Sequence, residues 1–303
     1  MIPAKKEWLR SEGDQWDVVT SVGYTALAVA AARAIVTSRP NPPARDVYAE
    51  SFVRASGEPY LISLIDGHRG SSEAAGPGWP EFISLQMQFF DTFFDTACVR
   101  GLRQVVIMAA GLDARAFRLA WPAGTQLFEV DQADVLDFKS RVLDARGAAP
   151  TAERHEVRVD LRDDWVAALI ASGFDPTLPT AWLVEGLLMY LPGAAHDALL
   201  ERINENSARG SELATHVFWP ADDFVGMFDT LSENNDPFAQ IKVTDLFYDD
   251  PRVNLVDWFS AQGWHVSSVT AGEISAQYGR PLLGISKQLD RAATTPRFVH
   301  AVR

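Results

Sequence analysis

Apolar and polar residues follow two different periods along this chain, and the change comes near Gly101. Before Gly101, apolar residues recur at intervals of three and four, which is typical of amphipathic helices. We predict helices over residues 17–38, 47–56 and 80–100, with a loop over 73–80 and a proline-rich break directly after Ser38. The first hundred residues are therefore expected to be helical.

After Gly101, short runs rich in β-branched residues alternate with helical patterns. We predict strands at 104–109, 126–130, 156–159, 181–184 and 212–218, separated by helices at 112–119, 133–146, 164–171 and 194–208. A helix over 253–262 and strands near 264–269 and 297–302, joined by a loop, close the pattern. Such alternation predicts an α/β fold with a parallel, doubly wound sheet, whose ligands bind at the carboxyl ends of the strands.

Composition narrows the possible partners of the chain. Its 303 residues carry 40 acidic against 27 basic side chains, a formal net charge of −13, which argues against binding to nucleic acid. The single cysteine, Cys98, excludes an intrachain disulfide and offers no metal cluster, as expected for a reducing compartment. The N-terminus lacks a signal-peptide pattern, and the apolar segment at 24–35 is too short to span a bilayer. We expect a cytoplasmic protein without membrane or metal partners.

Small residues end the first predicted strand, at Ala109, Ala110 and Gly111. They let the backbone approach a ligand, and the N-terminus of the following helix offers free N–H groups, with Asp113 as a cap. The tight turn of an ordinary α/β protein has the same residues. Asp131 ends the next strand, 20 residues beyond Gly111, where an acid accepts hydrogen bonds from both ribose hydroxyls. Together they predict a nucleoside site, and a degenerate nicotinamide fingerprint remains an alternative.

Two more acids end the third and fourth predicted strands. Asp160, followed by Leu161, is placed to contact the amino group and ring nitrogen of an adenine, although a solvated helix cap explains the same residues. Glu185 lies among strongly apolar residues and needs a cationic or hydrogen-bonding partner. That partner is either a structural arginine or the cationic end of a ligand. Three acids around one cofactor suit the positive sulfur of S-adenosylmethionine better than an anionic pyrophosphate.

Four ordered blocks resemble actinobacterial S-adenosylmethionine-dependent methyltransferases related to leucine carboxyl methyltransferases: VVIMAAGLDARAFRL, FEVDQADVLDFK, VRVDLRDDW and AWLVEGLLMYLP. The N-terminal blocks TALAVAAARAI and DVYAESFV are similar too, so the resemblance covers most of the chain. It implies a class I methyltransferase fold, which is Rossmann-like: a seven-stranded sheet with the last strand pair antiparallel. It also implies a helical N-terminal cap, here residues 1–101, and a cofactor-binding core over 102–303. The implied cofactor residues are Ala109, Ala110, Gly111, Asp131, Gln132, Asp160, Leu161, Glu185 and Gly186.

The chain departs from the family pattern at two places. Ala109 stands where the family turn generally has its first glycine, and the added methyl group either crowds the cofactor or forces a positive φ. Relatives often carry an arginine in the helix before the first strand, suited to the cofactor carboxylate, whereas this chain reads Gln86-Met87-Gln88. Arg33 is a candidate substitute. These departures keep open a methyltransferase-like protein that no longer transfers methyl, such as a cyclase, an isomerase or a binding protein.

The leading hypothesis is O-methylation of a small, largely apolar metabolite, at a carboxyl or a hydroxyl group. A carboxylate acceptor requires alignment and no base, whereas a hydroxyl acceptor benefits from one, and His216 is the candidate. Residues 220–251 are acidic, aromatic and irregular, which predicts a lid-like insertion facing the substrate. The candidate acceptor-pocket residues are Tyr190, Phe218, Trp219, Phe224 and Phe228. A nicotinamide-dependent oxidoreductase is the third, disfavoured reading, and the oligomeric state is not indicated.

Overall fold

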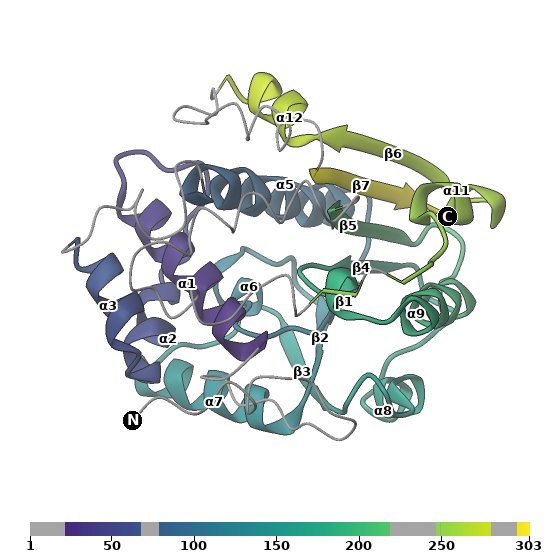
Figure 1. Ribbon diagram of the computed structural model, residues 1–303. Helices are drawn as coiled ribbons and strands as arrows, with labels where there is room; N and C mark the ends of the chain where they lie inside the picture. Colours follow the sequence, from purple (N-terminus) through teal and green to yellow (C-terminus); the bar gives the residue numbers. More distant parts are fainter. Residues whose placement is uncertain (1–21, 68–78, 219–246, 249, 280–295) are drawn as a thin grey trace.

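The computed structural model describes residues 22–67, 79–218, 247–248, 250–279 and 296–303. Within these residues, four helices precede the first strand: α1 (Val22–Ser38), α2 (Ala49–Ser56), α3 (Pro59–Ile65) and α5 (Trp79–Val99). Figure 1 shows α1, α2 and α3 gathered to one side of the sheet, with α5 running beside it. The regular elements described in the first hundred residues are thus all helices, as the apolar spacing predicts.

Strands and helices alternate after α5. The elements are β1 (Gln104–Met108), α6 (Arg115–Arg118), β2 (Gln126–Asp131), α7 (Ala133–Ala145), β3 (Glu153–Arg158), α8 (Trp165–Ala171), β4 (Thr180–Val184), the 3-10 helix η1 (Leu188–Tyr190), α9 (Gly193–Glu205) and β5 (Glu212–Phe218). After them come α11 (Leu255–Ala261), β6 (His265–Thr270), α12 (Ala271–Gln277) and β7 (Pro296–Val302).

The strands form one seven-stranded sheet in the order β3-β2-β1-β4-β5-β7-β6. β1 to β5 pair in parallel, and β7 is antiparallel to both of its neighbours, which confirms the predicted class I methyltransferase arrangement. The chain passes from β1 outward to β3 and then returns to place β4 on the other side of β1. Such a reversal opens the ligand-binding crevice at the carboxyl ends of β1 and β4.

Side-chain alternation along the strands builds a separate apolar layer on each face of the sheet. In β1, Val105 and Ile107 pack with the N-terminal helices, whereas Val106 and Met108 pack with α8, α9 and α11. All five residues of β1 are buried, which explains why its sequence is a continuous apolar run. No helix in the described part of the chain has both the length and the apolar character needed to cross a membrane.

Four elements differ from the sequence predictions. The helix expected over 112–119 is only the four-residue α6, because a turn closed by the N–H of Asp113 on the carbonyl of Ala110 occupies its start. The loop expected after β6 contains α12, which begins with a capping box between Thr270 and Glu273. α3 was not predicted, although Glu58 caps it and a proline follows. β3 begins at Glu153, three residues before the predicted start, because the polar residues at its beginning pair with β2 through their backbone.

Candidate functional site

The turn after β1 has left-handed backbone at two positions, Ala109 with φ 48° and Gly111 with φ 46°. Of the two alternatives that the sequence left open for Ala109, the positive φ is present. Residues other than glycine adopt this left-handed backbone conformation at an energetic cost, because their Cβ atom approaches the following carbonyl oxygen. The turn nevertheless forms, and it directs the N–H of Gly111 to Oδ2 of Asp131 at 2.6 Å.

Asp131, at the end of β2, accepts two backbone hydrogen bonds, from Gly111 at Oδ2 and from Gln132 at Oδ1 (2.7 Å). Burial raises the pKa of Asp131 above its ordinary value, against the lowering effect of these two N–H donors. A carboxylate has about four lone-pair positions. Among the described residues, Asp131 therefore keeps an acceptor position on each oxygen, the arrangement that a pair of neighbouring hydroxyl groups requires.

The helix after this turn is shorter than the sequence predicts, and one N–H group at its start is already bound. α6 has only four residues, and Oδ1 of Asp113 accepts the N–H of Arg115 at 2.6 Å. Asp113 also pairs through Oδ2 with the Arg115 side chain. The N-cap of α6 is Ala114, which makes no side-chain cap hydrogen bond, so Asp113 lies one residue before the cap and binds only the N–H of Arg115 there.

Asp160 follows β3 and joins Asp131 through the side chain of Gln132. Nε2 of Gln132 donates to Oδ2 of Asp160 at 2.8 Å. Arg162 binds the same carboxylate with its backbone N–H (2.8 Å), with Nε (2.9 Å) and with Nη2 (2.7 Å). Hydrogen bonds from the Arg162 side chain lower the pKa of Asp160, although partial burial opposes them. The sequence singled out Asp160 and Gln132 but not Arg162.

Glu185 follows β4 and lies at the centre of a buried charge network. Its Oε1 accepts from Arg33 Nη2 at 2.6 Å and from Gln86 Nε2 at 2.5 Å, and its Oε2 accepts from Arg115 Nη1 at 2.7 Å. Burial raises the pKa of Glu185, but Arg115 and Arg33 outweigh it and hold that pKa well below its ordinary value. Glu185 therefore has the arginine partners that one reading of the sequence required, and Gly186 follows it with a left-handed φ of 68°.

Arg33, on α1, is the candidate substitute for the arginine that the sequence lacks in α5. It reaches from α1 to the same carboxylate oxygen as Gln86, the residue at the α5 position where the sequence shows no cation. Arg33 also lies 3.9 Å from Asp46, which begins the segment before α2. The tertiary structure thus brings a cation from another helix to this end of the site.

Arg115 is fully buried and was not among the residues singled out from the sequence. Besides Glu185 and Asp113, it binds Oδ1 of Asp91 in α5 at 2.9 Å, and its guanidinium lies over the ring of Phe90. Three buried carboxylates raise its pKa well above the ordinary value, outweighing burial.

His216, the candidate base, lies on β5 with its ring against Phe90 and Phe298. It is only 3% exposed, and burial lowers its pKa to about 4, although the charge of Glu185 opposes this shift. The imidazole is consequently neutral at neutral pH. Its role as a base stays a prediction.

Tyr190, a candidate pocket residue, connects three parts of the chain. Its hydroxyl pairs with that of Thr25 in α1 at 3.2 Å, and its ring contacts Phe247, whose centroid is 5.4 Å away. Phe218 ends β5, but its side chain is outside the described residues. Trp219, Phe224 and Phe228 also lie outside them, so the acceptor pocket stays a prediction.

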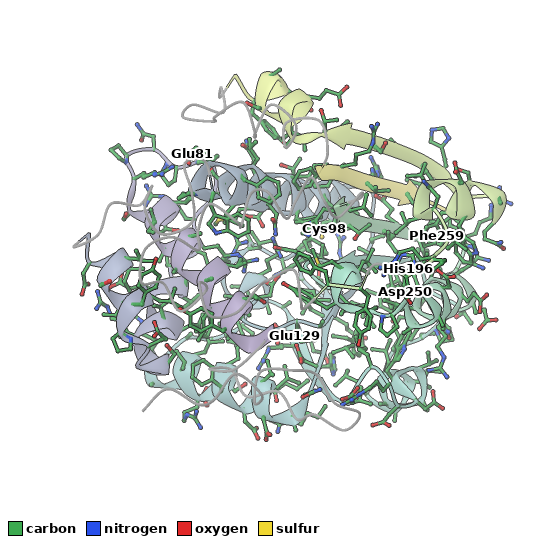
Figure 2. All side chains as sticks on the ribbon, viewed as in Figure 1. Glu81, Cys98, Glu129, His196, Asp250 and Phe259 are labelled. Atoms are coloured by element: carbon green, nitrogen blue, oxygen red, sulfur yellow. The ribbon has the colours of Figure 1, made fainter. Side chains whose placement is uncertain are left out.

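The predicted lid-like insertion, 220–251, falls mostly outside the described residues, but its end is anchored firmly. Arg252 donates to the carbonyls of Leu188 (3.0 Å), Leu191 (3.2 Å) and Tyr248 (2.8 Å). Asp250 accepts the N–H of Gly193 at 2.5 Å, and Figure 2 shows Asp250 close to His196, near the start of α9. The segment entering α11 is thus tied to the loop that follows Glu185.

The described residues fit a nucleoside that carries a charged amino-acid tail. From β3 to β4, the strand ends present Asp160, Asp131, the Gly111 turn and Glu185, in the spatial order of the sheet. Asp131 has acceptor positions for two ribose hydroxyls. The carboxylate of Glu185 suits the ammonium of the tail, and the guanidinium of Arg33 suits its carboxylate. S-adenosylmethionine, which the sequence resemblance implies, has all of these groups.

Comparison with known proteins gives a consistent result. The model of the leucine carboxyl methyltransferase family matches residues 26–204. A protein from Mycobacteroides abscessus with the provisional name S-adenosyl-L-methionine-dependent methyltransferase is 47% identical over 300 residues, covering 98% of this chain and 97% of its own. A protein from Rhodococcus jostii with the same provisional name is 47% identical over 298 residues, covering 97% of this chain and 100% of its own.

Solved structures agree on the fold. A methyltransferase assigned by similarity from Thermobifida fusca superimposes with a TM-score of 0.51 at 13% identity, covering 91% of this chain and 94% of that one. A DUF574-family protein from Streptomyces avermitilis has a TM-score of 0.50 at 12% identity, covering 90% of this chain and 96% of that one. The family match and the close relatives together show that the chain belongs to the leucine carboxyl methyltransferase family.

Proposed function

We propose that this S-adenosylmethionine-dependent methyltransferase of the leucine carboxyl methyltransferase family methylates a carboxylate oxygen of a small, largely apolar acid. The observation that carries the proposal is the row of strand-end groups formed by Asp160, Asp131, the Gly111 turn and Glu185. A nicotinamide-dependent oxidoreductase has no support from the family or from the relatives.

Each group in the row has a proposed role toward the cofactor. Asp131 accepts the ribose hydroxyls, and Asp160 with Leu161 contacts the adenine. Glu185 binds the cofactor ammonium, while Arg33 pairs with its carboxylate in place of the arginine found in relatives. Ala109, Ala110 and Gly186 let the backbone pass close to the ligand, and Gln132 holds Asp160 in place (2.8 Å). The bound cofactor supplies a methyl group made electrophilic by its positive sulfur.

The chemistry of His216 favours a carboxylate acceptor over a hydroxyl acceptor. General-base catalysis is most effective when the base has a pKa near the working pH. The pKa of His216 is lowered to about 4 by burial, so this imidazole is a weak base toward a hydroxyl group. A carboxylate is already ionised and needs only alignment with the methyl group. Tyr190 and the aromatic residues of the insertion are proposed to exclude water around the acceptor.

The test uses S-adenosylmethionine with an isotopically labelled methyl group and a panel of small apolar acids and their alcohol counterparts. We expect labelled product from acids, together with S-adenosylhomocysteine, and we expect mild alkali to release the label as methanol because the product is an ester. An alkali-stable product would indicate a hydroxyl acceptor. Tight cofactor binding without any labelled product would support a protein that no longer transfers methyl. Glu185→Gln is the site variant and Glu50→Gln, at an exposed position on α2, is its control.

A further inference from the structure

All lone-pair positions of the Asp160 carboxylate are occupied. Oδ1 accepts the N–H and Nε of Arg162, and Oδ2 accepts Nη2 of Arg162 and Nε2 of Gln132. These four hydrogen bonds match the roughly four acceptor positions of a carboxylate. Asp131, one strand away, accepts only two among the described residues. The two carboxylates proposed to face the nucleoside therefore differ in the number of unoccupied acceptor positions.

An adenine amino group donates hydrogen bonds, so it needs an acceptor position on Asp160. On the proposed function, on which this inference rests, one of the four present donors has to give way. The side chain of Arg162 is the donor that can do so at the smallest cost, because it is 53% exposed and its pair with Asp160 is of the surface kind. Gln132 is held between two strand ends, and the backbone N–H of Arg162 is part of the turn.

Arg162 would act in the opposite sense on a purine that has an oxygen in place of the amino group. A 6-oxo oxygen carries partial negative charge, so a bare Asp160 carboxylate would repel it, whereas the guanidinium bound to Asp160 through Nε and Nη2 neutralises that carboxylate. With Arg162 present, the strand end repels an oxo group less and has one acceptor position fewer for an amino group. Without it, the bare carboxylate would favour the amino group.

We propose that Arg162 sets the selectivity of this site at the purine 6-position, by competing with the adenine amino group for Asp160 and by neutralising the carboxylate charge that would repel a 6-oxo group. The residue is a specificity determinant at the far end of the cofactor from the methyl group. It lowers the discrimination between adenosyl and inosyl ligands below the level that Asp160 alone would give.

The test is calorimetric titration of S-adenosylhomocysteine and S-inosylhomocysteine into the wild-type chain and into Arg162→Ala. We expect the variant to bind S-adenosylhomocysteine about two- to five-fold tighter, as for loss of a competing exposed ion pair, and S-inosylhomocysteine weaker by a similar factor. Arg158→Ala is the matched control, because Arg158 is an exposed arginine at the end of β3 that pairs with Asp137 and Glu156 instead. Both affinities should stay unchanged in it.

A second measurement needs no variant that might alter folding. Salt screens an exposed ion pair, so high salt should tighten S-adenosylhomocysteine binding to the wild-type chain and weaken S-inosylhomocysteine binding. An unchanged affinity ratio in Arg162→Ala, or a change of both affinities in one direction, would overturn the role of Arg162. Failure of the wild-type chain to bind S-adenosylhomocysteine would instead overturn the proposed function, and this inference with it.

Discussion

Glu185 and Asp160 lie at the two ends of the row of strand-end groups that runs from β4 to β3, and both are carboxylates bound by arginine, yet one is buried and the other is partly exposed. The Glu185 side chain is 10% exposed, and its partner Arg115 is not exposed at all. Asp160 is 22% exposed, and its partner Arg162 is 53% exposed. The hydrogen bonds at the two ends have similar lengths, 2.7 Å for each closest arginine contact at these pairs.

The difference shows that burial, more than contact geometry, decides what each ion pair contributes. Removing one partner of a buried pair leaves an uncompensated charge in a poorly solvated place, whereas water replaces a lost partner at the surface. The buried end is therefore expected to hold the N-terminal helices on the sheet, since Glu185 joins α1, α5 and α6. The exposed end is free to exchange partners with a ligand.

The largest expected effect comes from replacing the two arginines in the same way. Arg115→Met should lower the free energy of unfolding by about 3–5 kcal/mol, because Asp91, Asp113 and Glu185 lose a shared buried cation. Arg162→Met should lower it by no more than about 1 kcal/mol. Urea unfolding followed by circular dichroism measures both, and equal losses would remove the distinction between the two ends.

Asp131 lies between the two ends, and a substitution there tests whether its acceptor positions bind the ribose hydroxyls. Asp131→Asn replaces an acceptor oxygen with a donor and removes the charge, so we expect S-adenosylhomocysteine to bind about 10- to 100-fold more weakly, the range for a hydrogen bond to a charged group. Isothermal titration gives the affinity. Asp134→Asn, at an exposed position early in α7, is the control and should bind as the wild type does. Undiminished binding by Asp131→Asn would contradict the ribose role.

His216 gives the buried end a pH dependence between about pH 5 and about pH 7. Its pKa of about 4 in the folded chain lies below the ordinary value of 6.5, so the unfolded chain binds more protons between these values. Stability must then fall as the pH falls, by about 2 kcal/mol between about pH 7 and about pH 5 for this group. Urea unfolding at both pH values should show that loss in the wild type and much less of it in His216→Gln. An equal loss in the variant would assign the pH dependence to other groups.

The smallest expected effect concerns the strained turn between the two ends. Ala109→Gly should raise the free energy of unfolding by about 1 kcal/mol, because glycine adopts the positive φ of 48° without steric cost. It should also tighten cofactor binding by removing a methyl group from the turn. Ala110→Gly is the control, since Ala110 is buried and has no positive φ, and it should lower stability by about 0.5–1 kcal/mol. Similar changes in both variants would show that the strain is unimportant.

Local patterns in the sequence predicted most of the fold and part of the site. The sequence showed the apolar run of β1 over residues 105–108, which is fully buried in the structure. It also showed the acid 20 residues beyond Gly111. Arg115 was not visible, because nothing in its neighbours shows that a four-residue helix turns it inward. Arg162 was missed for a related reason, since an exposed arginine two residues after an acid is an ordinary surface feature.

The sequence alone determines the succession of strands along the chain and the positions of Asp131, Asp160 and Glu185 after them, because periodicity is a local property. Which charges meet is decided only by the tertiary structure. Arg33 and Glu185 are 152 residues apart along the chain, yet they form a 2.6 Å hydrogen bond because α1 packs against α5, and α5 packs against β4. Burial makes the loss of either partner of the Arg33–Glu185 ion pair costly, whereas water can replace either partner of the exposed Asp160–Arg162 pair.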